Sequence, residues 1–256
     1  MILREMESQR NNLMKKHNKV FISWSGGLDS TYLIEKTLKD NPTINVETGY
    51  IKIVNNDTKV ECELKAIKKM ESIFHDKYGH RFNHLGTLLS VDVNRTPAEV
   101  CLKQVPIWLF GLFMSSPRQV DSIQLSYVMN DDAVSYLNDI KQVWRSMKHI
   151  GYGEHPPIKF PLIKHNKAQI FSELSDEIRR HVWWCETPYK KDADGNFLPC
   201  GECVPCQHNP CMQEKAKADK FSLKLDNTEF EINNKSTDYQ FGLAAAEPYK
   251  FSSSEH

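Results

Sequence analysis

The sequence predicts an α/β fold in which helices cover both faces of a mostly parallel sheet. Short apolar runs alternate with segments whose apolar residues recur at helical spacing, at a steady pace from residue 19 to residue 180. The first run, KVFISW at 19–24, reads as a strand that is buried on both faces. A chain of 256 residues is also long enough to bury a full hydrophobic core.

The other strands are marked in the same way. The second, at 44–53, follows Pro42, and the third, HLGTLLSV, spans 84–91. The fourth, DSIQLSYV, spans 121–128, and IKFPLI at 158–163 predicts a short extended segment.

The helices are expected at 31–39, 60–78, 100–114, 133–150 and 166–180. The second and fourth carry apolar residues at helical spacing along one stripe. The third is apolar on most sides, and Pro106 predicts either a kink or a late start. The last opens with Asn166 and Gln169, a pair that is typical of a capping box.

Composition limits the classes of partner. Lys and Arg total 33 and Asp and Glu total 33, so no net charge attracts nucleic acid or an anionic membrane. This balance does not exclude a local basic cleft. The first 20 residues are polar, unlike a signal peptide, and no apolar window approaches the ~18 residues of a membrane span. We therefore expect a cytoplasmic protein without stable nucleic-acid or membrane binding, with a homodimer as one option for its assembly.

A polar stretch, SGGLDST, directly follows the first strand. Around Leu28 it supplies two glycines, three hydroxyls and a carboxylate, from Ser25, Gly26, Gly27, Asp29, Ser30 and Thr31. In a parallel sheet the first turn from strand to helix is the preferred seat for a phosphate, because bare backbone and the helix start present N–H donors. The carboxylate suits a Mg²⁺ ion that bridges phosphates. The stretch predicts a phosphate site; a tight turn with a helix cap is the alternative.

Five of the seven cysteines fall between residues 185 and 211. The predicted metal ligands are Cys185, Cys200, Cys203 and Cys206. The last three are separated by two residues each, and four thiolates suit a tetrahedral Zn²⁺ in a closed, structural site. Cys211 is expected to be a spare and His208 a weaker substitute ligand. Free thiols and an iron–sulfur cluster are the alternatives.

The residues SGGLDS at 25–30 carry a family resemblance. They resemble the SGGxDS pyrophosphate loop of the PP-loop ATP pyrophosphatases, also called adenine nucleotide alpha hydrolases. The resemblance implies a Rossmann-like domain that cleaves ATP to AMP and pyrophosphate while forming an acyl- or imidoyl-adenylate. It also implies that residues 25–31 bind ATP with Mg²⁺, and that Ser25 and Asp29 take part in catalysis.

A PP-loop followed by this cysteine pattern is similar to the 7-cyano-7-deazaguanine synthase family of queuosine biosynthesis. The stretch at 160–174 resembles that family's segment before its zinc site, with Lys167 at the lysine, which implies a catalytic role for Lys167. Lys59 and Glu63 match a basic residue and a glutamate of the family. The resemblance implies a ligase that forms C–N bonds. It would convert 7-carboxy-7-deazaguanine and ammonia into the nitrile through adenylates, for queuosine or another deazapurine modification of nucleic acid. Free ammonia is expected, because residue 2 is Ile and no glutaminase is visible.

Three residues after the fourth strand are predicted to bind the substrate, namely Asn130, Asp131 and Asp132. A carboxylate there could accept two N–H bonds from a guanine-like edge. A helix N-cap at the start of 133–150 is the alternative for the two aspartates.

Two other functions stay open. Residues 53–59 and 104–108 differ from the synthase family's substrate stretches, so another PP-loop adenylating enzyme, an amide ligase or a tRNA-modifying enzyme, is one alternative. Thiolation would need a nucleophilic cysteine, and Cys62 and Cys101 are expected to be inert small side chains. A nucleotide-binding zinc protein without turnover is the other alternative.

Four parts of the chain are expected. They are an N-terminal extension at 1–18, a PP-loop domain at 19–180, a zinc subdomain at 181–212 and a C-terminal extension at 213–256. The extension contains a candidate hairpin at 221–232 and ends in a polar tail that is expected to be partly disordered.

Overall fold

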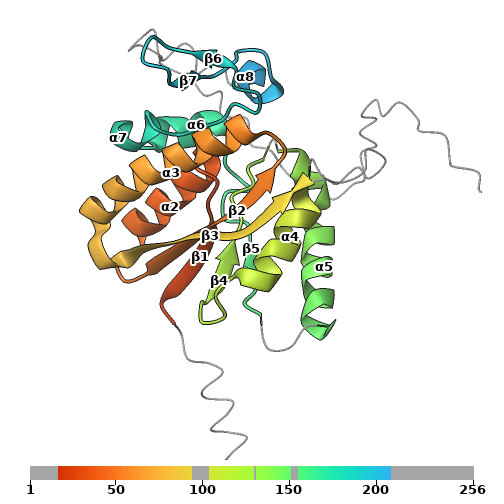
Figure 1. The fold of residues 1–256 in the computed structure, drawn as a ribbon. Helices are drawn as coiled ribbons and strands as arrows, with labels where there is room; N and C mark the ends of the chain where they lie inside the picture. The colour runs from red at the N-terminus through yellow and green to blue at the C-terminus, as the bar shows by residue number, and fades with distance from the viewer. Residues whose placement is uncertain (1–16, 94–103, 130, 151–154, 209–256) are drawn as a thin grey trace, which may run out of the picture. The chain divides into compact units, whose positions relative to one another are not determined.

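A computed structural model describes residues 17–93, 104–129, 131–150 and 155–208, all within a compact unit that spans residues 1–217. Five strands form one parallel sheet in the order β3-β2-β1-β4-β5 (Figure 1). They are β1 (Lys19–Ser23), β2 (Asn45–Val54), β3 (Phe82–Asp92), β4 (Ser122–Gln124) and β5 (Ile158–Lys159). The chain order reverses between β1 and β4, which is where doubly wound sheets bind ligands.

Helices pack on both faces of the sheet, so the predicted α/β class with a parallel sheet is confirmed (Figure 1). One face carries α2 (Leu28–Asp40), α3 (Asp57–Tyr78), α6 (Lys167–Glu173) and α7 (Asp176–Arg179). The other carries α4 (Gln104–Ser115) and α5 (Leu137–Ile150). Strand β1 contributes to both cores, because Ile22 packs with the first group of helices and Phe21 with the second.

Shorter elements complete the described chain. Two 3₁₀ helices, η1 (Gly79–Arg81) and η3 (Asp132–Tyr136), precede β3 and α5. After α7 the chain forms a two-stranded hairpin, β6 (Lys190–Lys191) with β7 (Phe197–Leu198), and then α8 (Val204–His208). None of the helices in the described ranges is long and apolar enough to cross a membrane.

Strand β4 is shorter than the predicted strand at 121–128. Beyond Leu125 the backbone leaves the sheet, because the Val128 N–H donates to Oδ2 of Asp131 at 2.9 Å and the Met129 N–H to the His165 carbonyl at 2.9 Å. These bonds replace ladder bonds and turn the chain at the carboxyl end of the sheet. Asp131 is thereby held beside the switch point between β1 and β4.

The single helix predicted at 166–180 is wrong in its length, because it is divided into α6 and α7. Its predicted capping box is present: the Gln169 N–H donates to the Asn166 side chain at 2.9 Å, and the Asn166 N–H to the Gln169 side chain at 3.0 Å. The break follows Leu174, which is extended, and the Ser175 N–H donates to Oε2 of Glu35 at 2.9 Å. A buried carboxylate on α2 therefore takes a donor that a continuous helix would use.

Glu35 is a buried carboxylate on α2 that contacts both α3 and the start of α7. We expect Glu35→Gln to destabilise the fold. Its carboxylate is 1% exposed and also meets Lys77 at 3.0 Å and Lys39 at 3.2 Å. Burial alone would raise its pKa, but the bonds from Ser175 and the lysines outweigh burial and lower it. The stabilisation is therefore present above the unfolded-state pKa and is lost as the pH falls through the lower, folded-state value.

At pH 7 we expect Glu35→Gln to lower the free energy of unfolding by about 2 kcal/mol. Urea titration from pH 7 to pH 3 measures this, and the difference from wild type should shrink at the acid end. Asp40→Asn is the control on the same helix, because Asp40 is 54% exposed and forms a surface ion pair with Lys36. Equal losses in the two variants would contradict the role given to Glu35.

Several predictions fall outside the described residues. They include Asn130, Cys101, the first part of the helix predicted at 100–114 and the hairpin predicted at 221–232. The domain boundaries stay predictions. Helix α4 is described from Gln104, and Pro106 lies in its first described turn.

Candidate functional site

The stretch at 25–31 connects β1 to α2 at the carboxyl end of the sheet. Trp24, fully buried, anchors its start: its backbone N–H donates to the Gly49 carbonyl at 2.9 Å, and its indole N–H donates to the Thr31 hydroxyl at 3.0 Å. Thr31 is itself fully buried. Its hydroxyl therefore serves the core, while the residues between Trp24 and Thr31 form the loop.

Gly26 requires the conformation that only glycine adopts easily. Its φ is +75°, and an added Cβ would lie 3.1 Å from the Glu63 carbonyl oxygen and 3.1 Å from Cγ1 of Ile67. Its own carbonyl accepts a bond from the Trp183 N–H at 2.9 Å. The loop is thus pressed against α3 on one side and tied to the segment before the cysteines on the other.

Helix α2 begins three residues earlier than expected, so Leu28, Asp29 and Ser30 belong to its first turn. Its N-cap is Gly27, and no side chain caps it among the described residues. The first N–H groups of a helix have no partner within the helix, so an uncapped start offers donors to an anion. The plain alternative of a turn closed by a capping side chain does not describe this loop.

The loop hydroxyls lie close together. Oγ of Ser25 is 3.5 Å from Oγ of Ser30, which donates to the Gly27 carbonyl at 3.4 Å. Ser30 is buried, whereas Ser25 is half-buried and lines a cavity. Ser25 is therefore the loop hydroxyl that reaches open space most directly.

Three residues that are far apart in the sequence meet at this loop. Nζ of Lys167, in the first turn of α6, lies 3.5 Å from Oδ2 of Asp29 and 3.1 Å from Oδ1 of Asp131. The two carboxylates raise the pKa of Lys167 against the opposing effect of its burial, so the ammonium is charged. A catalytic role was predicted for Lys167 and Asp29 and a substrate role for Asp131, and the fold places them together.

Asp29 is poised for a cation. Burial raises its pKa to about 6, an effect that Lys167 partly offsets and Asp131 reinforces. Its second oxygen, Oδ1, is buried and has no hydrogen-bond partner among the described residues. A buried carboxylate oxygen without a partner is the donor that Mg²⁺ prefers, so the residues present fit the ion.

The loop opens into a cavity of about 180 Å³. Ser25, Gly27, Asp29 and Lys167 line it, together with the aromatic side chains of Trp108, Trp183 and Trp184. Lys59 also lines it, and its Nζ lies 2.5 Å from Oε2 of Glu186 and 3.8 Å from Oε1 of Glu63.

Lys59, Glu63 and Glu186 form a network of charged side chains in this cavity. Tyr50 donates its hydroxyl to Glu63, and burial raises the pKa of that carboxyl while Lys59 lowers it in part. Lys59 is 8% exposed, so a buried cation faces the same cavity as the loop. The cavity thus combines the loop, a buried and a half-buried ammonium group, and an aromatic lining.

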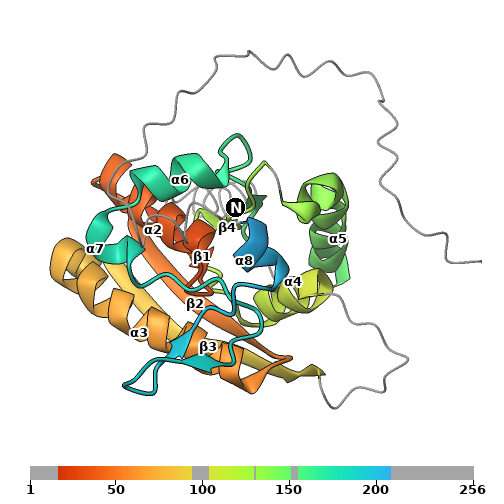
Figure 2. The same ribbon diagram turned by 90° about the horizontal axis from the view of Figure 1, so that it is seen from above.

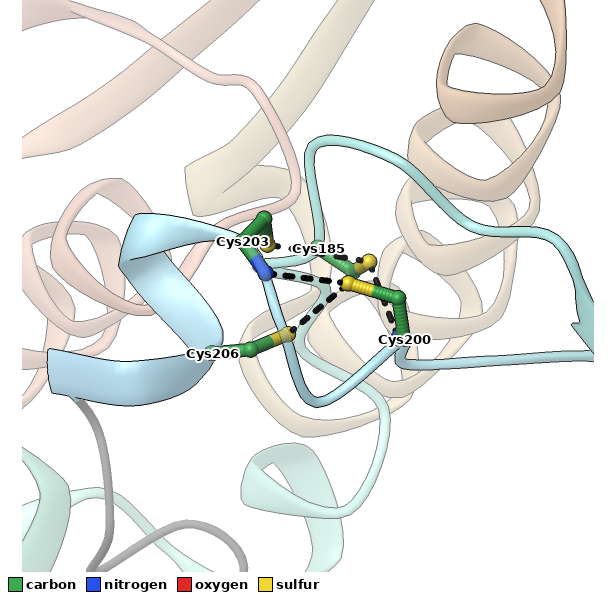
Figure 3. A group of neighbouring side chains, drawn as sticks. All are labelled: Cys185, Cys200, Cys203 and Cys206. Atoms are coloured by element: carbon green, nitrogen blue, oxygen red, sulfur yellow. Dashed lines mark hydrogen bonds between the residues drawn. The ribbon is translucent and has the colours of Figure 1, made fainter.

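The four predicted metal ligands form one group (Figure 3). Their sulfur atoms all lie within 4.8 Å of one another, with Cys200 and Cys206 3.9 Å apart and Cys185 and Cys203 4.0 Å apart. A tetrahedron with metal–sulfur bonds of ~2.3 Å has edges of roughly 3.8 Å. The spacing therefore fits one tetrahedral ion.

Hydrogen bonds favour the thiolate form of one of these sulfurs, that of Cys200. Sγ of Cys200 lies 3.5 Å from the Thr187 hydroxyl and accepts the N–H groups of Glu202 at 3.3 Å and Cys203 at 3.2 Å. These bonds, led by the one from Thr187, lower the pKa of Cys200 to about 6. Because the thiolate is the form that binds metal, this cysteine is ready for an ion at neutral pH.

The segment from Cys185 to His208, which carries the four cysteines, lies over the carboxyl end of the sheet. Figures 1 and 2 show the hairpin and α8 on the side toward which β1 runs. Cys185 and Pro205 line the same cavity as the loop, and the Asn56 side chain donates to the Glu186 carbonyl at 3.5 Å. A metal held by the four cysteines would therefore fix one wall of the loop cavity.

The remaining predicted residues divide as follows. Asp132 is the first residue of η3, and Asn130 lies outside the described residues. Asp131 is the N-cap of η3 but makes no side-chain cap bond, because its oxygens meet the Val128 N–H and Lys167 instead. Sequence reasoning missed Glu186 and Trp108, whose contacts depend on how distant segments pack and which no local motif marks.

No protein-family model and no curated protein matches the sequence. Among solved structures, the chain is similar to the U34-tRNA thiolase NcsA from Methanococcus maripaludis with its [4Fe-4S] cluster. The TM-score is 0.41 and the sequences are 13% identical over 80% of this chain and 70% of that chain.

Proposed function

We propose that this chain is a PP-loop enzyme that splits ATP at the α-phosphate to activate a carboxylic acid and joins it to ammonia. The acid we propose is 7-carboxy-7-deazaguanine, and the product is its nitrile. The observation that carries the proposal is the meeting of Asp29, Lys167 and Asp131 at an uncapped loop that opens into a cavity also lined by the buried Lys59.

The reaction needs two activations. In the first, the acid's carboxylate oxygen attacks the α-phosphorus, pyrophosphate leaves, and ammonia then displaces AMP to give an amide and release a proton. In the second, the amide oxygen attacks the α-phosphorus of another ATP, pyrophosphate leaves, and the amide nitrogen loses one proton. Loss of AMP and of the second N–H proton then leaves the nitrile. AMP is a good leaving group where hydroxide is not, which is why the acid must be adenylated.

The residues at the loop end would act on the departing pyrophosphate. The N–H groups at the start of α2 and the Ser25 hydroxyl would donate to its oxygens, and Lys167 would neutralise charge that grows on them. A Mg²⁺ ion on Asp29 would add charge stabilisation and hold the phosphates in line. Preformed donors of this kind stabilise the transition state without reorganisation.

The charged network around Lys59 would hold the acid. Lys59 is the cation suited to its carboxylate, and Glu186 occupies that ammonium until the acid enters. Glu63, whose pKa is raised chiefly by burial, is the carboxylate suited to receive a proton from ammonium. Trp108, Trp183 and Trp184 would keep water from the adenylates. Zn²⁺ on the four cysteines would have a structural role.

The proposal is tested by following AMP and the acceptor together. The purified, metal-loaded chain is incubated with ATP, Mg²⁺, ammonium and 7-carboxy-7-deazaguanine. AMP is quantified, and the deazapurine product is identified by mass spectrometry. We expect a nitrile and two AMP per nitrile. AMP that forms only with other carboxylic acids or with tRNA would contradict the acceptor, and no AMP with any acceptor would indicate a nucleotide-binding protein without turnover.

A further inference from the structure

A second cavity, of about 340 Å³, is lined by Trp183 and Trp184, which also line the loop cavity. Its walls are one face of α3, the residues that follow α7, and the β6–β7 hairpin. The two cavities share only those two tryptophans among their lining residues, so the second one is not an extension of the loop site.

The second cavity is cationic. Helix α3 contributes Lys65 and Lys69, four residues apart on one face, and the segment after α7 contributes Arg180. Lys65 meets Glu61 at 3.4 Å on the exposed surface, a pair that solvent screens. Lys69 and Arg180 have no carboxylate within ion-pair distance among the described residues. Three cations thus face one space.

The single carboxylate in the lining, that of Asp192, is hydrogen-bonded within its own turn. Oδ1 of Asp192 accepts the N–H groups of Asp194 at 3.0 Å and Asn196 at 2.8 Å, which close the turn of the hairpin. The Asn196 side chain donates to its other oxygen at 3.2 Å. These bonds satisfy the carboxylate within its own turn and lower its pKa. It does not neutralise the lysines.

The cations also act on a neighbouring imidazole. His181 lines the cavity, and its pKa is lowered first by burial and then by Lys69 and Arg180. Like charges that converge on a cavity without a counter-ion are costly unless an anion completes the site. A neutral imidazole beside them can still donate a hydrogen bond to such an anion.

The rest of the wall is aromatic. Trp183, Trp184 and Phe197 line the cavity, and Nζ of Lys191 lies 4.4 Å from the centre of the Phe197 ring. Aromatic faces next to cations are the combination that binds a nucleotide, because the base stacks and the phosphate is neutralised.

We propose that this second cavity binds one nucleotide unit, with its phosphate on Lys65, Lys69 and Arg180 and its base against the aromatic wall. The site is separate from the loop at 25–31 and goes beyond the proposed ligase activity. The same chemistry is offered by a free nucleoside monophosphate and by one nucleotide of a single-stranded RNA, so the test uses both.

The test measures binding of uridine monophosphate by calorimetry and of a fluorescein-labelled hexauridylate by polarisation, with the full, metal-loaded chain. Uridine is chosen because it lacks the adenine of ATP. We expect saturable binding that Lys69→Glu weakens about tenfold or more, since it replaces a phosphate-neutralising cation by a carboxylate. Arg180→Ala is the second variant and should weaken binding in the same direction. Tighter binding of the hexamer would identify the ligand as part of a strand, and equal binding as a free nucleotide.

Lys68→Glu is the matched control. It makes the same charge change one residue away on α3, where the side chain is exposed and does not line the cavity. Asp29→Asn should leave uridine binding unchanged, and Lys69→Glu should leave AMP formation unchanged, which separates this site from the loop. Absence of binding at ~1 mM, or an equal loss in Lys68→Glu and Lys69→Glu, would overturn the proposal.

Discussion

Asp29→Asn is expected to abolish AMP formation without destabilising the protein. The change keeps the shape of the side chain but removes the carboxylate that faces Lys167 and has a buried, unpartnered oxygen. Loss of a group that stabilises charge in the transition state typically lowers turnover about 10²- to 10³-fold, and loss of the Mg²⁺ ligand adds to it. We expect a decrease of at least about 10³-fold in the rate of AMP release.

Most substitutions of a buried group lower the free energy of unfolding, but Asp29→Asn is not expected to do so. The folded-state pKa of Asp29, about 6, lies above its ordinary value of 3.8, because burial disfavours the charged form. The folded protein therefore binds more protons, and this carboxyl reduces stability as the pH rises from about 4 to 6. At pH 8 the unfolding free energy of Asp29→Asn should thus be no lower than that of wild type. Asp40→Asn, at the far end of α2, should leave turnover unchanged. Retained AMP formation in Asp29→Asn would remove Asp29 from the site.

Cys203→Ser is expected to remove the metal and weaken the fold. Cys203 supplies one of the four sulfurs, and its backbone N–H supports the Cys200 sulfur at 3.2 Å. A hydroxyl does not replace a thiolate at a structural zinc site, and the binding energy of such a site is folding energy. We expect zinc to fall from one ion per chain to near zero, with a loss of at least about 3 kcal/mol of stability.

Elemental analysis of the purified chain, together with thermal unfolding, measures both effects. Cys62→Ser is the matched control, since Cys62 is buried but is not one of the four clustered sulfurs. It should keep its zinc. Equal zinc in Cys203→Ser and wild type would contradict the four-cysteine site, and iron with acid-labile sulfide in place of zinc would make the ion an iron–sulfur cluster.

The sheet and the metal group could be predicted because their signals are local. The buried run before Ser25 marks β1, and the two-residue spacing from Cys200 to Cys206 marks the ligands. The predicted ends of elements were less accurate where a distant side chain takes a backbone donor. Glu35 divides the last predicted helix in this way, and Asp131 shortens β4.

The site could be predicted only in part for the same reason. The loop was visible in the sequence, and so was Lys167 through its family resemblance. The approach of Lys167 to both aspartates depends on α6 packing against α2 and on the turn after β4. The pairing of Lys59 with Glu186 joins residues 127 positions apart, and no pattern in either segment indicates the other.

The identity of the adenosine product tests the central claim most directly. ATP labelled with ³²P at the α-position is incubated with the chain, Mg²⁺, ammonium and the acid, and the labelled products are separated. We expect the label in AMP, with pyrophosphate released in equal amount, because in the proposed mechanism the loop at 25–31 holds the leaving pyrophosphate. Label in ADP, with free phosphate as the other product, would contradict cleavage at the α-phosphate and the role given to the loop.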